Sequence, residues 1–134
     1  MTPTTHGYSG KPLFEKLGLK PGMRCQVFNA PPQYPALVAG ASGVRFMTRA
    51  KSADVVHLFC PDRATLENRL DRALACVAPG GMFWVSWPKK SSDLFVDLTE
   101  GQLRELILPR NWVDVKVCAV DQDWSGLKFL RRRQ

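Results

Sequence analysis

Apolar and polar residues follow two different periods along the chain, which separates candidate strands from candidate helices. Residues 54–60 and 82–87 are nearly continuous apolar runs rich in β-branched and aromatic side chains, which is typical of parallel strands covered on both faces. Between them, leucines recur at helical spacing over residues 63–77 while the charged residues fall elsewhere, and Asp62 offers an N-cap. The order of strand, helix and strand predicts one right-handed βαβ unit with parallel strands.

Shorter patterns precede this unit. Residues 12–17 predict a short opening helix that stops at Gly18. Residues 25–28 predict a strand, and residues 33–38 predict a brief helix after two prolines. The segment 79–81, Pro-Gly-Gly, is expected to end the central helix before the second buried strand begins at Met82.

The last third predicts a helix followed by two strands. Thr99 and Gln102 have capping-box spacing, so a helix is expected over residues 100–108. Two apolar runs, 113–120 and 127–130, are joined by a short polar segment, which predicts an antiparallel pair. The pattern therefore indicates a single α/β domain over residues 1–134, with a mostly parallel sheet, a C-terminal antiparallel hairpin and a loosely ordered N-terminal arm at residues 1–11.

Composition narrows the class of protein. The chain has 134 residues, of which 45% are apolar, and this is enough for one continuous core. Its net charge is +7, which favours contact with polyanions, but the basic residues are scattered apart from Lys89-Lys90 and residues 131–133. The recurring nucleic-acid-binding signatures do not occur, so a solvated basic surface is favoured over a nucleic-acid site.

Cysteine spacing and the N-terminal sequence bear on the compartment. The four cysteines stand singly, without a Cys-x-x-Cys pair for zinc or redox chemistry, and this favours reduced, buried thiols. No basic segment followed by an apolar stretch opens the chain, and no apolar run is long enough to span a bilayer. A cytoplasmic protein without a metal site or membrane contact is expected.

The segment 17–32, LGLKPGMRCQVFNAPP, resembles the lead-in to the cofactor turn of class I S-adenosylmethionine-dependent methyltransferases, and residues 77–85 are similar to the segment that enters a later strand of that family. The resemblance implies a Rossmann-like, methyltransferase-like fold. Asn29 and Pro31 stand where the family has glycines, and Val27 stands where an acidic residue is usual. S-adenosylmethionine is therefore not expected to bind in the usual way, and no cofactor is predicted.

Only about two dozen residues separate Asn29 from Asp54, where the methyltransferase family fits two further strands and helices. This suggests a truncated version of the fold in which the adenosine-binding side is largely absent. The chain also resembles, over essentially its whole length, a family of small bacterial proteins without an assigned function. That resemblance rests on residues 7–13, 29–31, 84–92, 115–121 and 124–128.

Ligands of open parallel sheets bind outside the carboxyl ends of the strands. This rule selects three loops, at residues 29–34, 61–63 and 86–92, as a candidate ligand site. The candidate ligand-binding residues are Asn29, Tyr34, Arg63, Ser86, Trp87, Lys89, Lys90, Ser91 and Ser92. No catalytic residue is assigned.

Each candidate has a structural alternative. Lys89 and Lys90, with the two serines that follow, either hold a phosphate or carboxylate beside Trp87 or form a solvated loop. Asn29 either contacts a ligand or ends its strand by bonding its own backbone, and the second role is favoured. Tyr34 either stacks on a ligand or belongs to the core. His57, in an apolar strand, is expected to be a core histidine rather than a general base.

The leading functional hypothesis is a binding or regulatory module that takes an anionic small molecule. A divergent methyltransferase or other transferase is the first alternative, and a basic nucleic-acid-associated protein is the second. A truncated sheet leaves an unpaired strand edge, which invites association, so a homodimer is also considered.

Overall fold

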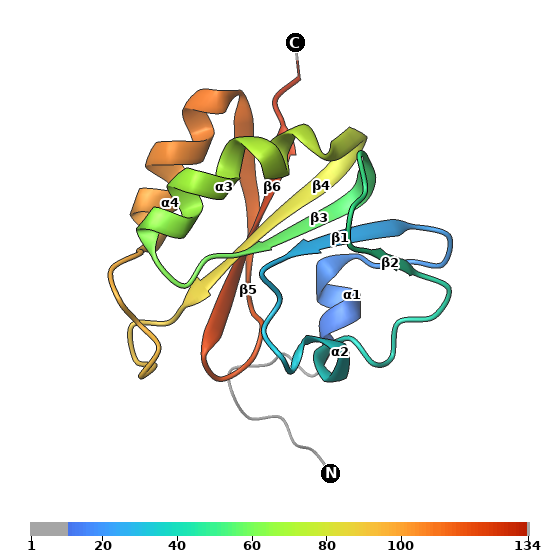
Figure 1. Cartoon of the computed structure of the whole chain (residues 1–134), viewed down its shortest axis with the longest axis horizontal. Coiled ribbons are helices and arrows are strands. Elements are labelled where there is room, and N and C mark those ends of the chain that lie inside the picture. The colour runs from blue at the N-terminus through green and yellow to red at the C-terminus, as the bar shows by residue number, and fades with distance from the viewer. Residues whose placement is uncertain (1–10, 134) are drawn as a thin grey trace.

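The computed structural model describes residues 11–133 and folds them around one six-stranded sheet with strand order β2-β1-β3-β4-β6-β5 (Figure 1). The expected arm at residues 1–11 lies outside the described residues except for Lys11. The strands are β1 (Arg24–Phe28), β2 (Arg45–Met47), β3 (Ala53–Phe59), β4 (Val77–Pro88), β5 (Trp112–Ala119) and β6 (Trp124–Arg131). The helices are α1 (Leu13–Leu17), α2 (Tyr34–Leu37), α3 (Arg63–Ala75) and α4 (Glu100–Ile107), followed by the short 3-10 helix η1 (Leu108–Arg110).

The predicted βαβ unit is confirmed as β3, α3 and β4, with β3 and β4 parallel. Asp62 caps α3, accepting a hydrogen bond from the Thr65 amide at 2.8 Å. One boundary prediction is wrong: residues 79–81 lie inside β4, which already begins at Val77. Gly81 lets β4 run close to the backbone of β3, since a side chain at this position would place its Cβ only 2.8 Å from the Asp54 carbonyl oxygen.

The segment between β1 and β3, residues 29–52, contributes a further strand. Residues 45–47 form β2, which pairs parallel to β1 at the edge of the sheet and which the apolar pattern does not predict. The short helix α2 precedes β2, in agreement with the expected helix at residues 33–38. This part of the chain therefore holds one strand and one helix.

The C-terminal hairpin is confirmed as antiparallel, and β6 inserts between β4 and β5. Four parallel strands therefore continue into an antiparallel pair, which gives the mostly parallel α/β sheet expected from the sequence. Because β6 runs against β4, the turn between β5 and β6 lies at the end of the sheet where β4 finishes.

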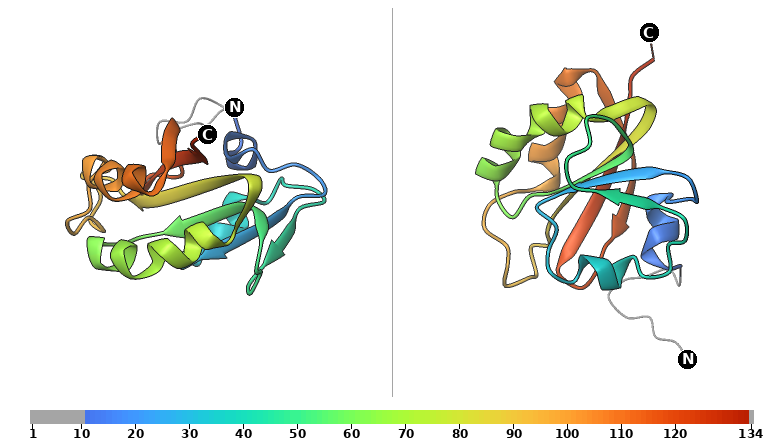
Figure 2. Two further views of the ribbon diagram at one scale, coloured as in Figure 1. Left: turned by 90° about the horizontal axis from the view of Figure 1, so that it is seen from above. Right: turned by 45° about the vertical axis from the view of Figure 1, so that its right-hand side comes forward.

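Helices cover both faces of the sheet, and Figure 2 shows α1 and α3 on opposite sides of it. One apolar cluster joins α3 and α4 to the sheet through residues such as Leu66, Leu70 and Leu103. The other cluster joins α1 and α2 to the opposite face around Trp84 and Phe59. No helix in residues 11–133 is long and apolar enough to cross a membrane. All four cysteines are free thiols.

Candidate functional site

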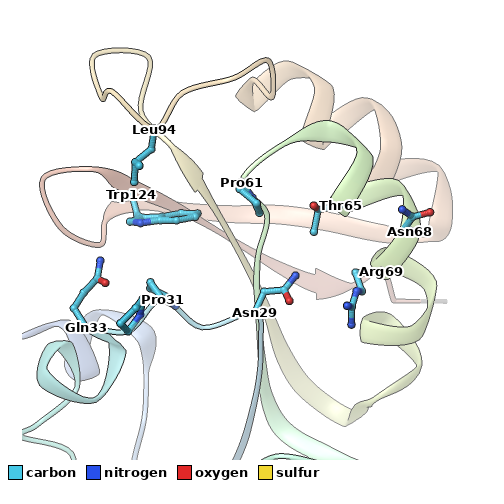
Figure 3. A pocket seen from close by; sticks show the side chains of 10 residues that line it. Asn29, Pro31, Gln33, Pro61, Thr65, Asn68, Arg69, Leu94 and Trp124 are labelled. Carbon is cyan, nitrogen blue, oxygen red and sulfur yellow. The ribbon is translucent and has the colours of Figure 1, made fainter.

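A pocket of about 590 Å³ opens at the carboxyl ends of β1 and β3, where the fold is expected to bind its ligands (Figure 3). Its walls come from the turn after β1, the turn after β3, the first half of α3, the segment after β4 and the start of β6. The lining residues are Asn29, Pro31, Pro32, Gln33, Pro61, Thr65, Asn68, Arg69, Leu94 and Trp124.

The turn after β1 is built by Asn29, which has a left-handed backbone with φ of 58°. Asn and Asp adopt this conformation more readily than other non-glycine residues, because a short polar side chain can bond nearby backbone. The Asn29 Nδ2 donates to the Phe59 carbonyl oxygen at 3.4 Å and ties β1 to β3. This bond is made to the neighbouring strand rather than to the backbone of Asn29 itself, and the exposed residue also borders the pocket.

Trp124 lines the pocket on the side opposite Arg69 (Figure 3). Its indole ring packs edge-on against Phe59, with the ring centroids 5.2 Å apart. The residue is only 7% exposed, so most of its indole packs in the core and the remainder borders the pocket. Gln33 lies near this side of the pocket and donates from Nε2 to the Asp121 Oδ2 at 3.1 Å. The turn between β5 and β6 is thus anchored to the segment after β1, which fixes the indole wall.

The polar wall comes from α3, where Thr65, Asn68 and Arg69 lie on one helical face. Sequence reasoning missed these three residues because it considered loops and treated the helix only through its apolar face. Their spacing of three and four positions, directly after the carboxyl end of a strand, was an available signal. Trp124 was also missed, since its position at this pocket depends on β6 lying beside β4.

The predicted residues after β4 lie at a different opening. Trp87, Lys89 and Lys90 line a pocket of about 480 Å³ beside the start of α4. The loop is held by the β5–β6 turn, because the Lys89 amide donates to the Asp123 carbonyl oxygen at 2.8 Å and the Ser92 hydroxyl donates to the Asp123 carboxylate at 2.7 Å. Trp87 itself is 6% exposed, so most of its indole packs in the core.

Three polar side chains form a buried chain beneath α2. The Tyr34 hydroxyl lies 3.4 Å from His57 Nδ1, and His57 Nε2 lies 2.7 Å from Ser86 Oγ. His57 and Ser86 have no solvent exposure, and Tyr34 is 5% exposed. Burial lowers the pKa of His57 to about 3, so its imidazole is neutral. His57 is the core histidine expected from the sequence, and Tyr34 takes the core alternative.

The predicted candidate set is thus divided by the structure. Asn29 alone of that set lines the pocket beside Trp124. Ser86 reaches no opening because it is fully buried against His57. The Arg63 guanidinium pairs with Glu67 at 2.9 Å, one turn along α3, and Ser91 is exposed in the loop after β4.

Comparison with solved structures identifies the fold. A S-adenosylmethionine-dependent methyltransferase from Aquifex aeolicus matches with a TM-score of 0.60 and 12% identity, covering 92% of this chain and 90% of that chain. The complex of DhpI with S-adenosylhomocysteine matches with a TM-score of 0.59 and 13% identity, over 92% of this chain and 83% of that chain. Magnesium protoporphyrin IX methyltransferase from Synechocystis PCC 6803 matches with a TM-score of 0.59 and 10% identity, over 89% of this chain and 74% of that chain.

No protein-family model matches the chain, and no curated protein matches it in sequence. At these low identities the structural likeness shows the fold alone, and it confirms the methyltransferase-like Rossmann fold expected from residues 17–32. The described residues nevertheless differ from a glycine-rich cofactor turn. Pro31 and Pro32 line the pocket, and neither has a backbone N–H to offer a ligand.

Proposed function

We propose that this protein is a non-catalytic binding module that takes a small molecule with a flat ring and an anionic group in the pocket between Trp124 and Arg69. One observation carries the proposal: the only ionisable side chain among the described lining residues is Arg69. Acid–base catalysis uses groups that titrate near the working pH, and an arginine does not do so. The pocket therefore has groups for recognition and lacks an evident acid or base.

The chemical class of the ligand follows from the two walls. A rigid indole and prolines on one side suit a planar apolar ring, since aromatic groups bury large areas at low entropic cost. A guanidinium on the other side binds phosphate or carboxylate through paired N–H donors. Asn29, Thr65 and Asn68 supply hydroxyl and amide groups between them for further polar atoms of the ligand.

Calorimetric titration with adenosine 5′-monophosphate, adenosine and inorganic phosphate tests both walls. We expect the nucleotide to bind more tightly than either part alone. Arg69→Gln should weaken nucleotide binding by about tenfold or more, which corresponds to roughly 1.4 kcal/mol, and should leave adenosine binding unchanged. Arg72→Gln is the matched control, because Arg72 is an exposed arginine one turn farther along α3 and does not line this pocket.

Absence of binding by all three probes, or an equal loss in Arg69→Gln and Arg72→Gln, would contradict the proposal. S-adenosylhomocysteine is the arm that distinguishes the methyltransferase alternative. Binding of this compound more tightly than the nucleotide, together with methyl transfer from labelled S-adenosylmethionine, would favour a methyltransferase. Such an enzyme would hold the cofactor of the family with a different turn after β1.

A further inference from the structure

A second basic opening lies between α1 and the C-terminal hairpin and shares no residue with the pocket beside Trp124. Its volume is about 560 Å³. Lys11 and Lys16 approach it from the α1 side, and Lys116, Cys118 and Ser125 approach it from the hairpin. We call this group of five residues the lysine pocket.

Two lysines of the C-terminal hairpin face each other across neighbouring strands. Lys116 on β5 stands directly opposite Lys128 on β6 in the antiparallel register, and like charges in that position destabilise a sheet. Burial lowers the pKa of Lys128, and the neighbouring Lys116 lowers it further.

Lys16 adds a third ammonium group from α1. It is only 7% exposed, and its Nζ donates to the Ala119 carbonyl oxygen at 3.5 Å. Its pKa is lowered chiefly by burial, while Cys118 acts in the opposite direction and Lys116 and Lys89 lower it further. The nearly buried position means that the positive field of the pocket is less screened by water than that of a surface loop.

No carboxylate lines the lysine pocket among the described residues. Within residues 11–133 every observed ion pair is made by an arginine. Lys11, Lys116 and Lys128 therefore form no ion pair in this part of the chain. A multivalent anion in this opening would relieve the repulsion between Lys116 and Lys128 and would accept hydrogen bonds from several ammonium groups at once.

We propose that the lysine pocket is a second binding site, for phosphate or the phosphate group of a small molecule, held by Lys11, Lys16 and Lys116 with the Ser125 hydroxyl. A compact phosphate suits this group better than a single carboxylate, because it offers oxygens in several directions to donors that converge from two elements. The site is independent of the function proposed for the pocket beside Trp124.

Calorimetric titration with inorganic pyrophosphate tests the site, with sodium chloride at matched ionic strength as the reference. We expect Lys116→Gln and Lys11→Gln each to raise the dissociation constant by about tenfold. Lys51→Gln is the control, because Lys51 is an exposed lysine that lines a different opening. Arg69→Gln should leave pyrophosphate binding unchanged, which separates this site from the one beside Trp124.

The stability of the unliganded protein gives a second readout. At low salt and without phosphate, Lys116→Gln should raise the urea midpoint of unfolding, because it removes a charge opposite Lys128. Lys51→Gln should not raise it. Compared with Lys116→Gln, the wild type should bind pyrophosphate more tightly and should unfold at a lower urea concentration when no ligand is present. This combination is expected where a residue serves ligand binding at a cost in stability.

The proposal is overturned if pyrophosphate has no effect beyond that of chloride, or if all lysine variants weaken it equally. A ten-nucleotide single strand is the remaining arm. Binding of that strand more tightly than pyrophosphate, weakened as much by Lys90→Gln as by Lys116→Gln, would replace the compact site by an extended nucleic-acid surface and would also overturn it.

Discussion

His57 lies fully buried between Tyr34 and Ser86, and its neutral imidazole uses both ring nitrogens in polar contacts. In the unfolded chain the same side chain has its ordinary pKa of 6.5, while burial lowers the pKa to about 3 in the folded state. Between these two values the unfolded state binds a proton that the folded state does not. Stability therefore falls as the pH falls from 6.5 toward 3, and rises again with pH.

We predict that lowering the pH from about 7.5 to about 5 removes about 2 kcal/mol of unfolding free energy through His57. Urea unfolding of the wild type and of His57→Asn at both pH values measures this contribution. Between the two pH values, the unfolding free energy of the variant should fall by about 2 kcal/mol less than that of the wild type. His6, the other histidine, is present in both proteins and cancels from the comparison. Equal pH dependence of the two proteins would show that His57 is not the group responsible.

At this scale the sequence indicates which residues are polar within apolar strands but not where their side chains end. The spacing predicts that Asn29 stops β1, and it does so with a left-handed backbone and a bond to Phe59 that depend on β3 lying alongside. Ser86 is a candidate because it lies in the segment 86–92, at the expected carboxyl end of β4. Its burial against His57 depends on the register of β3 and β4, which periodicity does not provide.

Helix α4 shows how a local signal fixes an element. The Thr99 hydroxyl accepts from the Gln102 amide and the Gln102 side chain accepts from the Thr99 amide, each at 3.3 Å, so the predicted capping box is confirmed. We predict that Thr99→Ala lowers the unfolding free energy by about 1 kcal/mol, whereas Thr99→Ser retains most of it. Urea unfolding of both variants tests this, and an equal loss in the serine variant would contradict the capping role.

Elements with strong periodicity were predictable, and those formed by tertiary contact were not. The leucines of α3 and the apolar runs of β3 and β4 are each long enough to indicate their own structure. Strand β2 has three residues, two of them exposed, and it exists because β1 offers an unpaired edge. The start of β4 at Val77 has the same origin, since Ala53 on β3 pairs with it.

At the scale of the whole molecule, the binding pocket assembles segments that are far apart in the sequence. Residues from the turn after β1, from α3 and from the start of β6 meet because β6 inserts next to β4 and brings Trp124 to the carboxyl edge. The sequence predicts the mostly parallel sheet with its C-terminal antiparallel hairpin, and the general rule for open parallel sheets selects the carboxyl edge as the candidate ligand site. The resemblance to methyltransferases did not predict which side chains line the pocket, because the turn after β1 departs from the family pattern.

The same topology leaves β5 as one of the two outer strands of the sheet, with Val115 and Val117 each about half exposed. Lys116 between them and the break in register beside Asp114 are features that discourage pairing with a second chain. We predict that Lys116→Val makes the edge continuous and apolar, so that the average mass in sedimentation rises with concentration more steeply than for the wild type. Lys128→Val is the matched control, because it changes the directly opposite lysine on β6, which is paired on both sides. A similar rise for both variants would mean that lost charge, rather than the β5 edge, drives the association.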